Sequence, residues 1–445
     1  MTETEAAARR SLLRNVFLET LRRTDITHCM REATHSEPGA LIIGDHTYRR
    51  ETVDRVVIVS IGKAAFPMAR VACERVASSG LTLSRAIAIG TGDNFGMPAQ
   101  VSVVRGSHPF PDTNSQATAL HVMEALRGLT ERDLVLFLIS GGSSAMIELP
   151  LNERFSADLV ADFHRALVHS GLGIKAINTL RKHFSAVKGG RLAFIAGRAQ
   201  KHTLLVSDVP DGQWDVIGSG PSLPDSSTRE DCWRILSENA AALKLPASVS
   251  SWFYGEGLPE TPKASEPCFE GARVNCLMST RTMLDVAAEL CSENGWEAVI
   301  DITCDDWDYR TAGDYLMDRL EREVRARGRA CLVSGGEVLV SLSAEHGVGG
   351  RNQQFALYCA TRLPQGLAAT LISVGSDGVD GNSPAAGAIV DSTTIKRGQQ
   401  VGLSAASALR QFDTYPFFKV LGDDVTVLPT GNNVRDLRIL LGERT

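Results

Sequence analysis

The first half of the chain alternates short, fully apolar runs with longer segments that are apolar on one face only. The runs Arg55–Ile61 and Asp133–Ile139 each end at a glycine or serine turn. Further strands are predicted at 86–90, 101–104 and 203–206, and helices at 64–77, 156–170, 174–184 and 186–197. A strand that is apolar on both faces needs helices on both sides, so the pattern predicts a parallel sheet.

A stretch rich in proline, glycine, serine and glutamate, at about 246–271, separates this half from the next. Beyond it, strands are predicted at 273–278, 298–303, 330–333 and 368–374, a hairpin partner at 338–343, and helices at 281–294, 309–327 and 351–363. The residues up to Arg23 form another predicted helix. We therefore expect two α/β domains, residues 1–255 and 256–445.

Composition narrows the class of protein. Of 445 residues, 43% are hydrophobic and 22% are charged, and the formal net charge is −6, with Lys and Arg scattered along the chain. This balance argues against a nucleic-acid partner, and no apolar run is long enough for a membrane span. The nine cysteines form no CxxC pair, and the first residues are typical of a helix and not of a signal peptide. We expect reduced thiols and a cytoplasmic location.

Glycine and serine turns follow most of the predicted strands. They lie at 62–63, 140–144, 218–222, 335–337, 347–352, 375–381 and 429–433. Glycine lets backbone N–H groups approach an anionic oxygen, and a helix that starts after the turn adds its positive end. The set predicts a ligand with several phosphates or carboxylates. Neither GxxxxGK[ST] nor a full GxGxxG is present, so the two common nucleotide motifs do not describe this site.

Charged residues in these turns are the candidates for chemistry. Lys63 and Arg351 suit phosphate or carboxylate binding, and the alternative is that both are ordinary surface residues. Asp377 and Asp380 follow a predicted strand and suit Mg²⁺ or a base that takes a hydroxyl proton, and the alternative is a pair of turn residues. Asp208 ends another strand and offers the same two interpretations. Ser143 is better placed to cradle an anion than to act as a nucleophile.

Several ordered motifs carry a family resemblance. They are Gly62-Lys63-Ala64-Ala65, His108-Pro109-Phe110-Pro111-Asp112, Ser140-Gly141-Gly142-Ser143-Ser144-Ala145, Lys188-Gly189-Gly190-Arg191, Ser334-Gly335-Gly336-Glu337, Gly349-Gly350-Arg351-Asn352, Asp377-Gly378-Val379-Asp380-Gly381 and Pro429-Thr430-Gly431-Asn432-Asn433. Over nearly its full length the chain resembles the glycerate kinases of the MOFRL type. The resemblance implies an ATP- and Mg²⁺-dependent kinase that phosphorylates the 2-hydroxyl of D-glycerate. It implies a Rossmann-like N-terminal domain with a parallel sheet, a smaller α/β MOFRL-like C-terminal domain, and an active site between them.

The resemblance also distributes roles. Lys63, Arg351 and Asp377 match the catalytic positions of the family. We expect the substrate to be bound by Ser140, Gly141, Gly142, Ser143, Arg181 and Arg191. We expect the nucleotide at Gly349, Gly350, Asn352, Thr430, Gly431 and Asn433, and the metal ion at Asp208 and Asp380. The expected partners are D-glycerate and ATP, with no nucleic acid and no membrane; a homodimer is also compatible with the sequence.

Two other activities stay open, and departures from the family pattern raise the first. Asp211-Gly212 stands where the family has Gly-Asp, and Asn432 replaces a threonine. A kinase for another short hydroxy acid is therefore an alternative. A hydroxypyruvate reductase is a second alternative, but it would need a nicotinamide site, for which the chain lacks the usual full GxGxxG.

Overall fold

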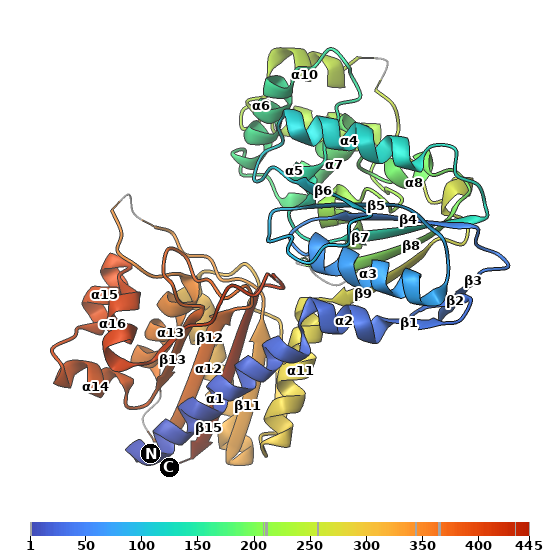
Figure 1. Ribbon diagram of the computed structural model, residues 1–445. Helices are drawn as coiled ribbons and strands as arrows, with labels where there is room; N and C mark the ends of the chain where they lie inside the picture. The colour runs from blue at the N-terminus through green and yellow to red at the C-terminus, as the bar shows by residue number, and fades with distance from the viewer. Residues whose placement is uncertain are drawn as a thin grey trace. The chain divides into compact units, whose positions relative to one another are not determined.

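Two compact units make up the chain, each with its own six-stranded sheet (Figure 1). The computed structural model describes residues 2–207, 209, 212–255, 258–342, 345–363, 366–431 and 433–444. The N-terminal unit is Ile26–Leu277, and the C-terminal unit is Met1–Asp25 together with Met278–Thr445. The predicted class, α/β in two domains with a parallel sheet in the first, is confirmed.

The division between the units differs from the predicted boundary at residue 255 in two places. Helix α1 (Glu3–Arg23) packs against α11 (Thr280–Glu293) in the C-terminal unit, where Arg10 forms an ion pair with the buried Asp391. Strand β9 (Arg273–Met278) is the edge strand of the N-terminal sheet. Contacts between residues far apart in sequence assign α1 and β9 to their units. The hydrophobic pattern along the chain does not contain this information.

The N-terminal sheet has the strand order β6-β5-β4-β7-β8-β9. Its central strands β4 (Arg55–Ile61) and β7 (Asp133–Ile139) pair in parallel, as predicted. Strands β5 (Leu83–Gly90), β6 (Val101–Arg105) and β8 (Gln200–Val206) continue the parallel pairing on either side. The carboxyl ends of β4 and β7 therefore lie side by side, which places their glycine turns at one edge.

Helices cover both faces of this sheet (Figure 1). The helices of this unit are α2 (Ile26–Ala33), α3 (Ala65–Ser79), α4 (Thr113–Leu126), α5 (Ser143–Met146), α6 (Ala157–Val168), α7 (Ile174–Phe184), α8 (Arg191–Ile195), α9 (Arg229–Glu238) and α10 (Ala247–Phe253), with 3-10 turns η1 (Trp214–Ser219) and η2 (Pro267–Phe269). A small antiparallel sheet of β1 (Thr34–Glu37), β2 (Ala40–Ile43) and β3 (His46–Arg49) was not predicted. The predicted helix at 186–197 is reduced to α8, because Gly189 and Gly190 adopt positive φ values of 54° and 80°.

The C-terminal sheet is mixed, with the order β10-β11-β15-β12-β13-β14. Its strands are β10 (Ala298–Asp301), β11 (Arg329–Gly335), β12 (Leu367–Gly375), β13 (Gly387–Asp391), β14 (Asp424–Val425) and β15 (Asp436–Arg444). Only β10 and β11 pair in parallel, and β15 lies antiparallel between β11 and β12. This insertion brings residue 436 next to the ends of β11 and β12.

Helices α1 and α11 cover one face of this sheet, and α12 (Tyr309–Arg327) with α13 (Arg351–Arg362) covers the other (Figure 1). Three short helices follow, α14 (Thr394–Gln400), α15 (Ala405–Gln411) and α16 (Thr414–Leu421). The predicted hairpin partner at 338–343 is wrong: its described residues form only an isolated bridge, between Leu339 and Asp308. Among the described helices, none combines the length and apolar character that a bilayer span requires.

Candidate active site

A cavity of about 360 Å³ lies in the N-terminal unit, next to the turn that follows β7. Its wall includes residues from that turn, from the His108–Pro109 turn, from α7 and from η1. They are His108, Pro109, Gly141, Gly142, Ser144, Ala145, His164, Ile174, Asn178, Arg181, Val209, Val216, Ile217 and Gly218. The cavity is small and has both glycine backbone and basic side chains on its wall.

The turns after β4 and β7 hold each other in place. The backbone N–H of Ala64 donates to the Ser140 hydroxyl at 3.0 Å, and the N–H of Lys63 donates to the Gly141 carbonyl at 3.0 Å. A Cβ on Gly62 would lie 2.3 Å from Ser140 Oγ. Ser140, a predicted substrate residue, is thus buried in this junction and is not on the cavity wall.

The first part of the Lys63 side chain lies next to Gly142 on the cavity wall. A Cβ on Gly142 would lie 3.4 Å from both Lys63 Cγ and His108 Cδ2, so both side chains border that glycine. Burial and the nearby Lys63 ammonium lower the pKa of His108. The Lys63 side chain is exposed, which leaves its charge available to a ligand.

Arg181, on α7, lies on the cavity wall and differs from an ordinary surface arginine. None of the described residues accepts a hydrogen bond from its side chain, and its Nε is buried without a partner. Burial lowers the pKa of the guanidinium, and the Glu148 carboxylate offsets part of that effect. The side chain is half-buried, and withdrawing a cation from water without giving it an acceptor costs free energy, so this position favours an anionic ligand.

Three buried groups, Glu148, Lys188 and His164, form a cluster that reaches the cavity wall at His164. Glu148 Oε2 lies 2.8 Å from Lys188 Nζ and 2.9 Å from His164 Nε2. Burial lowers the pKa of His164 to about 4, so its imidazole is neutral at pH 7. Glu148 and Lys188 therefore cancel, and the positive charge of Arg181 is left over.

Two other predicted substrate residues are placed away from the cavity wall. Arg191 donates to the Glu260 carbonyl at 3.2 Å, and burial lowers its pKa to about 10. Ser143 is buried, and its Oγ would lie 2.3 Å from a Cβ on Gly218. Asp208, a predicted metal ligand, lies outside the described residues.

A second cavity, of about 580 Å³, lies in the C-terminal unit, around the start of α13 and the turn after β12. Charged and glycine residues line one part of its wall and apolar residues another. The lining residues are Glu337, Val338, Leu339, Val340, Leu342, His346, Gly349, Gly350, Arg351, Gln354, Asp377, Val379, Asp380, Gly381, Asn382, Phe412 and Thr414. Three residues predicted from the turns, Arg351, Asp377 and Asp380, are thus brought together.

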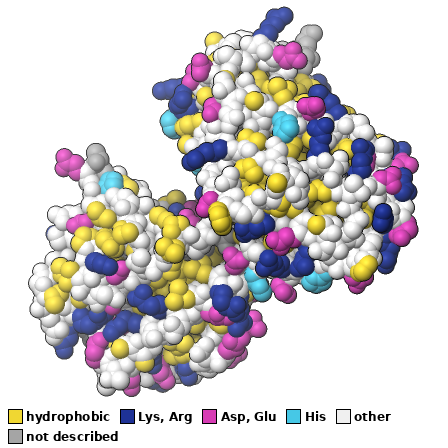
Figure 2. Space-filling view, in the orientation of Figure 1, with side chains coloured by type: hydrophobic (Ala, Val, Ile, Leu, Met, Phe, Trp, Pro, Cys, Tyr) yellow, Lys and Arg dark blue, Asp and Glu magenta, His cyan; other side chains and the backbone are white. Residues whose placement is uncertain are grey.

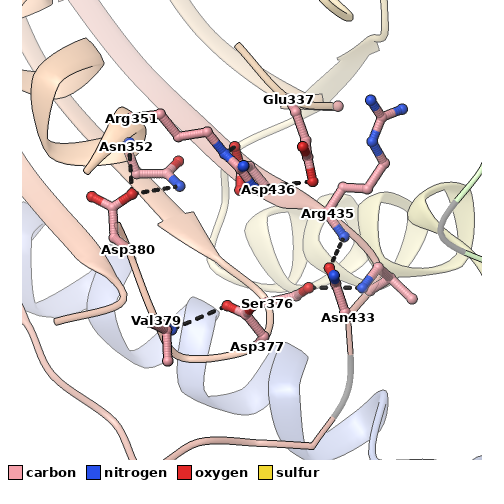
Figure 3. A network of polar contacts seen from close by, with 12 residues as sticks. Glu337, Arg351, Asn352, Ser376, Asp377, Val379, Asp380, Asn433, Arg435 and Asp436 are labelled. Carbon is pink, nitrogen blue, oxygen red and sulfur yellow. Dashed lines mark hydrogen bonds and ion pairs between the residues drawn. The ribbon is translucent and has the colours of Figure 1, made fainter. Parts of the chain in front are cut away.

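Arg351, the first residue of α13, is held by carboxylates (Figure 3). Its Nε and Nη2 donate to the two carboxylate oxygens of Asp436, at 2.8 and 2.9 Å, and Nη2 also lies 3.0 Å from Glu337 Oε1. The hydrogen bonds to Asp436 and the two nearby carboxylates raise the pKa of Arg351 despite its burial. Asp436 is fully buried and also accepts from Arg438 at 3.4 Å.

Asp377 and Asp380 have different surroundings (Figure 3). One Asp377 oxygen, Oδ1, accepts the Val379 N–H at 3.1 Å, and the side chain is half-buried. Asp380 is buried, and it accepts the backbone N–H groups of Asn352 at 3.0 Å and Gln353 at 2.9 Å. Asp380 therefore caps the start of α13, which occupies both of its oxygens. Burial raises the pKa of Asp380 to about 6.

The predicted nucleotide residues serve loop packing as well. A Cβ on Gly349 would lie 2.3 Å from Thr414 Oγ1, and one on Gly350 would lie 2.3 Å from Asp380 Oδ1. Asn352 is buried and bonds to Ser373. Thr430, Gly431 and Asn433 do not lie on the wall; the Thr430 hydroxyl donates to the Ser376 carbonyl at 2.7 Å, and Asn433 Oδ1 accepts the Arg435 N–H at 3.1 Å.

Asp436 was not among the predicted site residues, and Glu337 was only a weaker candidate from the turn at 335–337. Glu337 follows a glycine pair at the end of β11, and burial raises the pKa of its carboxyl group. The glycine pair was a usable signal for Glu337. Asp436 offered none, because it reaches Arg351 only through the central position of β15 in the sheet.

Comparison with known proteins connects this arrangement to a family. Residues 12–254 match the model of a domain of unknown function, DUF4147, and residues 330–436 match the model of the MOFRL family. D-glycerate 2-kinase of Thermotoga maritima is 36% identical over 399 residues, which cover 88% of this chain and 92% of the relative. The chain belongs to the family of MOFRL-type glycerate 2-kinases.

A second relative and a solved structure complete the comparison. A protein of Agrobacterium vitis, whose name gives hydroxypyruvate reductase as a provisional activity, is 34% identical over 393 residues, which cover 87% of this chain and 99% of the relative. A crystal structure of glycerate kinase from Thermotoga maritima matches with a TM-score of 0.84 and 33% identity, covering 98% of this chain and 99% of that one. The fold is thus shared with that glycerate kinase over nearly the full length of both chains.

Proposed function

We infer that this chain transfers the γ-phosphoryl group of ATP to the 2-hydroxyl of D-glycerate. The bond between the 2-oxygen and phosphorus forms, the bond from the γ-phosphorus to the bridging oxygen breaks, and ADP, 2-phosphoglycerate and a proton are released. Likeness to D-glycerate 2-kinase over 88% of the chain supports the reaction. One observation carries the substrate assignment: Arg181 is a half-buried cation on the wall of a small cavity, its Nε is buried without a partner, and no described residue accepts from its side chain.

In this proposal the glycerate carboxylate binds to Arg181. The guanidinium fork matches a carboxylate with two hydrogen bonds, and binding would supply the missing negative charge. The backbone of Gly141 and Gly142 lies on the same wall, without side chains that would fill the space. A cavity of about 360 Å³ is large enough for a three-carbon acid.

The C-terminal cavity is the proposed site of ATP. Arg351 would neutralise charge on the transferred phosphoryl group, and its three bonds to Asp436 and Glu337 set its direction before ATP binds. In the N-terminal unit, Lys63 would contribute a positive charge next to the substrate cavity, which its exposed side chain leaves available. Such pre-set charges stabilise phosphoryl transfer mainly by position and electrostatics. Asp377 would accept the proton of the 2-hydroxyl, because its Oδ2 makes no described hydrogen bond.

A Mg²⁺ ion would fit this cavity only as an ion held largely by phosphates. The described residues contain no group of three or more His, Cys, Asp or Glu side chains placed to hold a metal, but Mg²⁺ commonly uses only one or two carboxylates with phosphate oxygens and water. Asp380 does not fit, since its oxygens cap α13. Glu337 fits better: its Oε2 makes no described hydrogen bond, and it lies on the wall. When bound, the ion would offset negative charge on the phosphates.

The experiment that tests the proposal is a coupled assay of ADP release with ATP, Mg²⁺ and D-glycerate. We expect release to depend on both substrates and to vanish in Lys63→Ala. A panel of hydroxy acids with three to five carbons separates glycerate from the alternative substrates, and we expect glycerate to have the highest kcat/KM. A homodimer and a cytoplasmic location stay predictions; light scattering after size exclusion tests the first.

A second candidate activity is reduction of hydroxypyruvate, which the name of the Agrobacterium vitis relative suggests. Oxidation of NADH or NADPH on addition of hydroxypyruvate would support it. We expect no oxidation, because the turn after β4 reads Gly62-Lys63-Ala64-Ala65 and lacks the glycine spacing of a dinucleotide site.

A further inference from the structure

The C-terminal cavity is larger than phosphate binding requires, and half of its wall is apolar. Its volume of about 580 Å³ falls within the range of sites that bind drug-sized molecules. Arg351, Glu337 and Asp377 supply the charged part, whereas Leu339, Val340 and Phe412 belong to the apolar part. A triphosphate alone would leave this apolar part in contact with water.

The apolar wall is built on anchored backbone. Leu339 donates its N–H to the Trp307 carbonyl at 2.8 Å, and its own carbonyl accepts from the Tyr309 N–H at 3.1 Å. The Leu339 side chain is nevertheless 55% exposed. Figure 2 shows that apolar side chains reach the surface among charged ones in each unit, so exposure alone means little. What distinguishes Leu339 is that a fixed backbone presents it to a cavity that also holds Arg351.

Phe412 adds an aromatic ring in an unusual conformation. It ends α15 with φ 50° and ψ 39°, in the left-handed region that residues with a side chain rarely adopt. Such a conformation costs on the order of 1–3 kcal/mol and is concentrated at ligand sites. The ring is partly exposed on the cavity wall, where it could lie against a flat ligand.

The amide oxygen of Gln354 has no hydrogen-bond donor among the described residues, although its amide nitrogen has two acceptors. Its Nε2 donates to the Leu409 carbonyl at 2.9 Å and to Tyr309 Oη at 3.2 Å. Because a carbonyl can only accept, this bond fixes the orientation of the amide. Its Oε1 is buried and, among the described residues, has no donor. A ligand with an amino group next to an aromatic ring would supply that donor.

We propose that the wall formed by Leu339, Val340 and Phe412 holds the adenine base of ATP, with Gln354 accepting from its amino group. The proposal rests on the proposed kinase function, and it adds which part of the cavity selects the nucleoside. Adenine combines a flat apolar face with an exocyclic amino donor, and its phosphates would extend towards Arg351. The base then covers the exposed leucine and satisfies the buried amide oxygen.

The test compares two aspartate substitutions at equally exposed apolar residues. Leu339→Asp places a charge on the proposed base site. Val401→Asp is the matched control, because Val401 is also 55% exposed in the same unit but is not on the cavity wall. Binding of a non-hydrolysable ATP analogue and of inorganic tripolyphosphate is measured by calorimetry, and KM for ATP and for D-glycerate by the coupled assay.

We expect Leu339→Asp to raise the Kd of the ATP analogue at least tenfold and to leave tripolyphosphate binding and the KM for D-glycerate within twofold. Val401→Asp should match the wild type in all four. Equal ATP binding by the two variants would overturn the base site. A chain that binds the analogue but makes no phosphoglycerate would contradict the kinase and leave the Leu339 comparison intact, so the two failures are distinguishable.

Discussion

Two arginines, one on the wall of each cavity, have opposite electrostatic surroundings. Arg351 has the carboxylates of Asp436 and Glu337 within 3.0 Å, whereas no described residue accepts from the side chain of Arg181. The first is neutralised and oriented without a ligand. The second has no hydrogen-bonded carboxylate among the described residues, so a bound anion would neutralise it directly. The difference indicates two roles. Arg351 is oriented to stabilise negative charge that develops in the transition state, whereas Arg181 is placed to bind a carboxylate that the substrate already carries.

The largest effect is expected on kcat, from a substitution of the proposed general base. Asp377→Asn should lower kcat by roughly a thousandfold, since removing a general base typically costs 10²–10⁴ in rate. The fold should persist, because the side chain is half-buried and its Oδ1 accepts one hydrogen bond, which an asparagine oxygen can also accept. The coupled assay together with a thermal unfolding midpoint checks both parts. A variant with near-normal kcat would remove Asp377 from the chemistry.

Substituting each arginine by methionine tests the comparison itself. Arg181→Met should raise the KM for D-glycerate by about 100-fold, the loss of a charge-assisted pair. Its unfolding midpoint should equal or exceed that of the wild type, because a half-buried charge without an acceptor among the described residues is removed.

Arg351→Met should do the reverse to stability. It leaves the buried Asp436 with only Arg438, and the side chain of Arg351 is 37% exposed, so we expect a loss of about 2 kcal/mol, less than for a fully buried pair. Urea unfolding of the two variants measures both effects. If both lower stability equally, Arg181 has an acceptor and the contrast is wrong.

The two units should also respond oppositely to pH. Burial lowers the pKa of His164 and His202 in the N-terminal unit to about 4, whereas both protonate near 6.5 when unfolded. Between these values the unfolded chain binds more protons, so this contribution to stability rises with pH, by up to about 3 kcal/mol per residue.

Asp380 in the C-terminal unit has a pKa raised from 3.8 to about 6, so its contribution falls with pH in that range. Hydrogen exchange, corrected for intrinsic rates and resolved by unit, measures both slopes, and His202→Gln should flatten that of the N-terminal unit. The same slope sign in both units would contradict the assignment.

The smallest effect is expected at the rim of the substrate cavity. Ser144 Oγ lies 3.0 Å from Ser219 Oγ, which in turn donates to Asn178 Oδ1 at 3.0 Å. Ser144→Ala should cost about 1 kcal/mol of this network and raise the KM for D-glycerate several-fold with kcat unchanged. An unchanged KM would show that the network does not shape the cavity.

Sequence patterns predicted the elements whose signal is local. The strands Arg55–Ile61 and Asp133–Ile139 and the helices at 174–184 and 309–327 have the predicted bounds. The central strand β15 was missed, because its position in the sheet depends on pairing with two strands that precede it in sequence.

The site shows the same division. The glycine turns marked Arg351 and Asp377 as residues near ligands, the roles assigned after the family resemblance included Arg181, and the structure places all three on cavity walls. The sequence did not reveal that Asp380 caps a helix or that Asp436, 85 positions away, pairs with Arg351. The same residue type can stabilise the fold or bind a ligand, and only its contacts in the structure show which role it has.

The most direct test of the central claim is to identify the product formed from ATP, Mg²⁺ and D-glycerate. Phosphorus NMR distinguishes a phosphoryl group on the 2-oxygen from one on the 3-oxygen, and coupling to enolase detects the first directly. The account predicts 2-phosphoglycerate with one ADP per product. Formation of 3-phosphoglycerate, or no ADP release with glycerate, would contradict it.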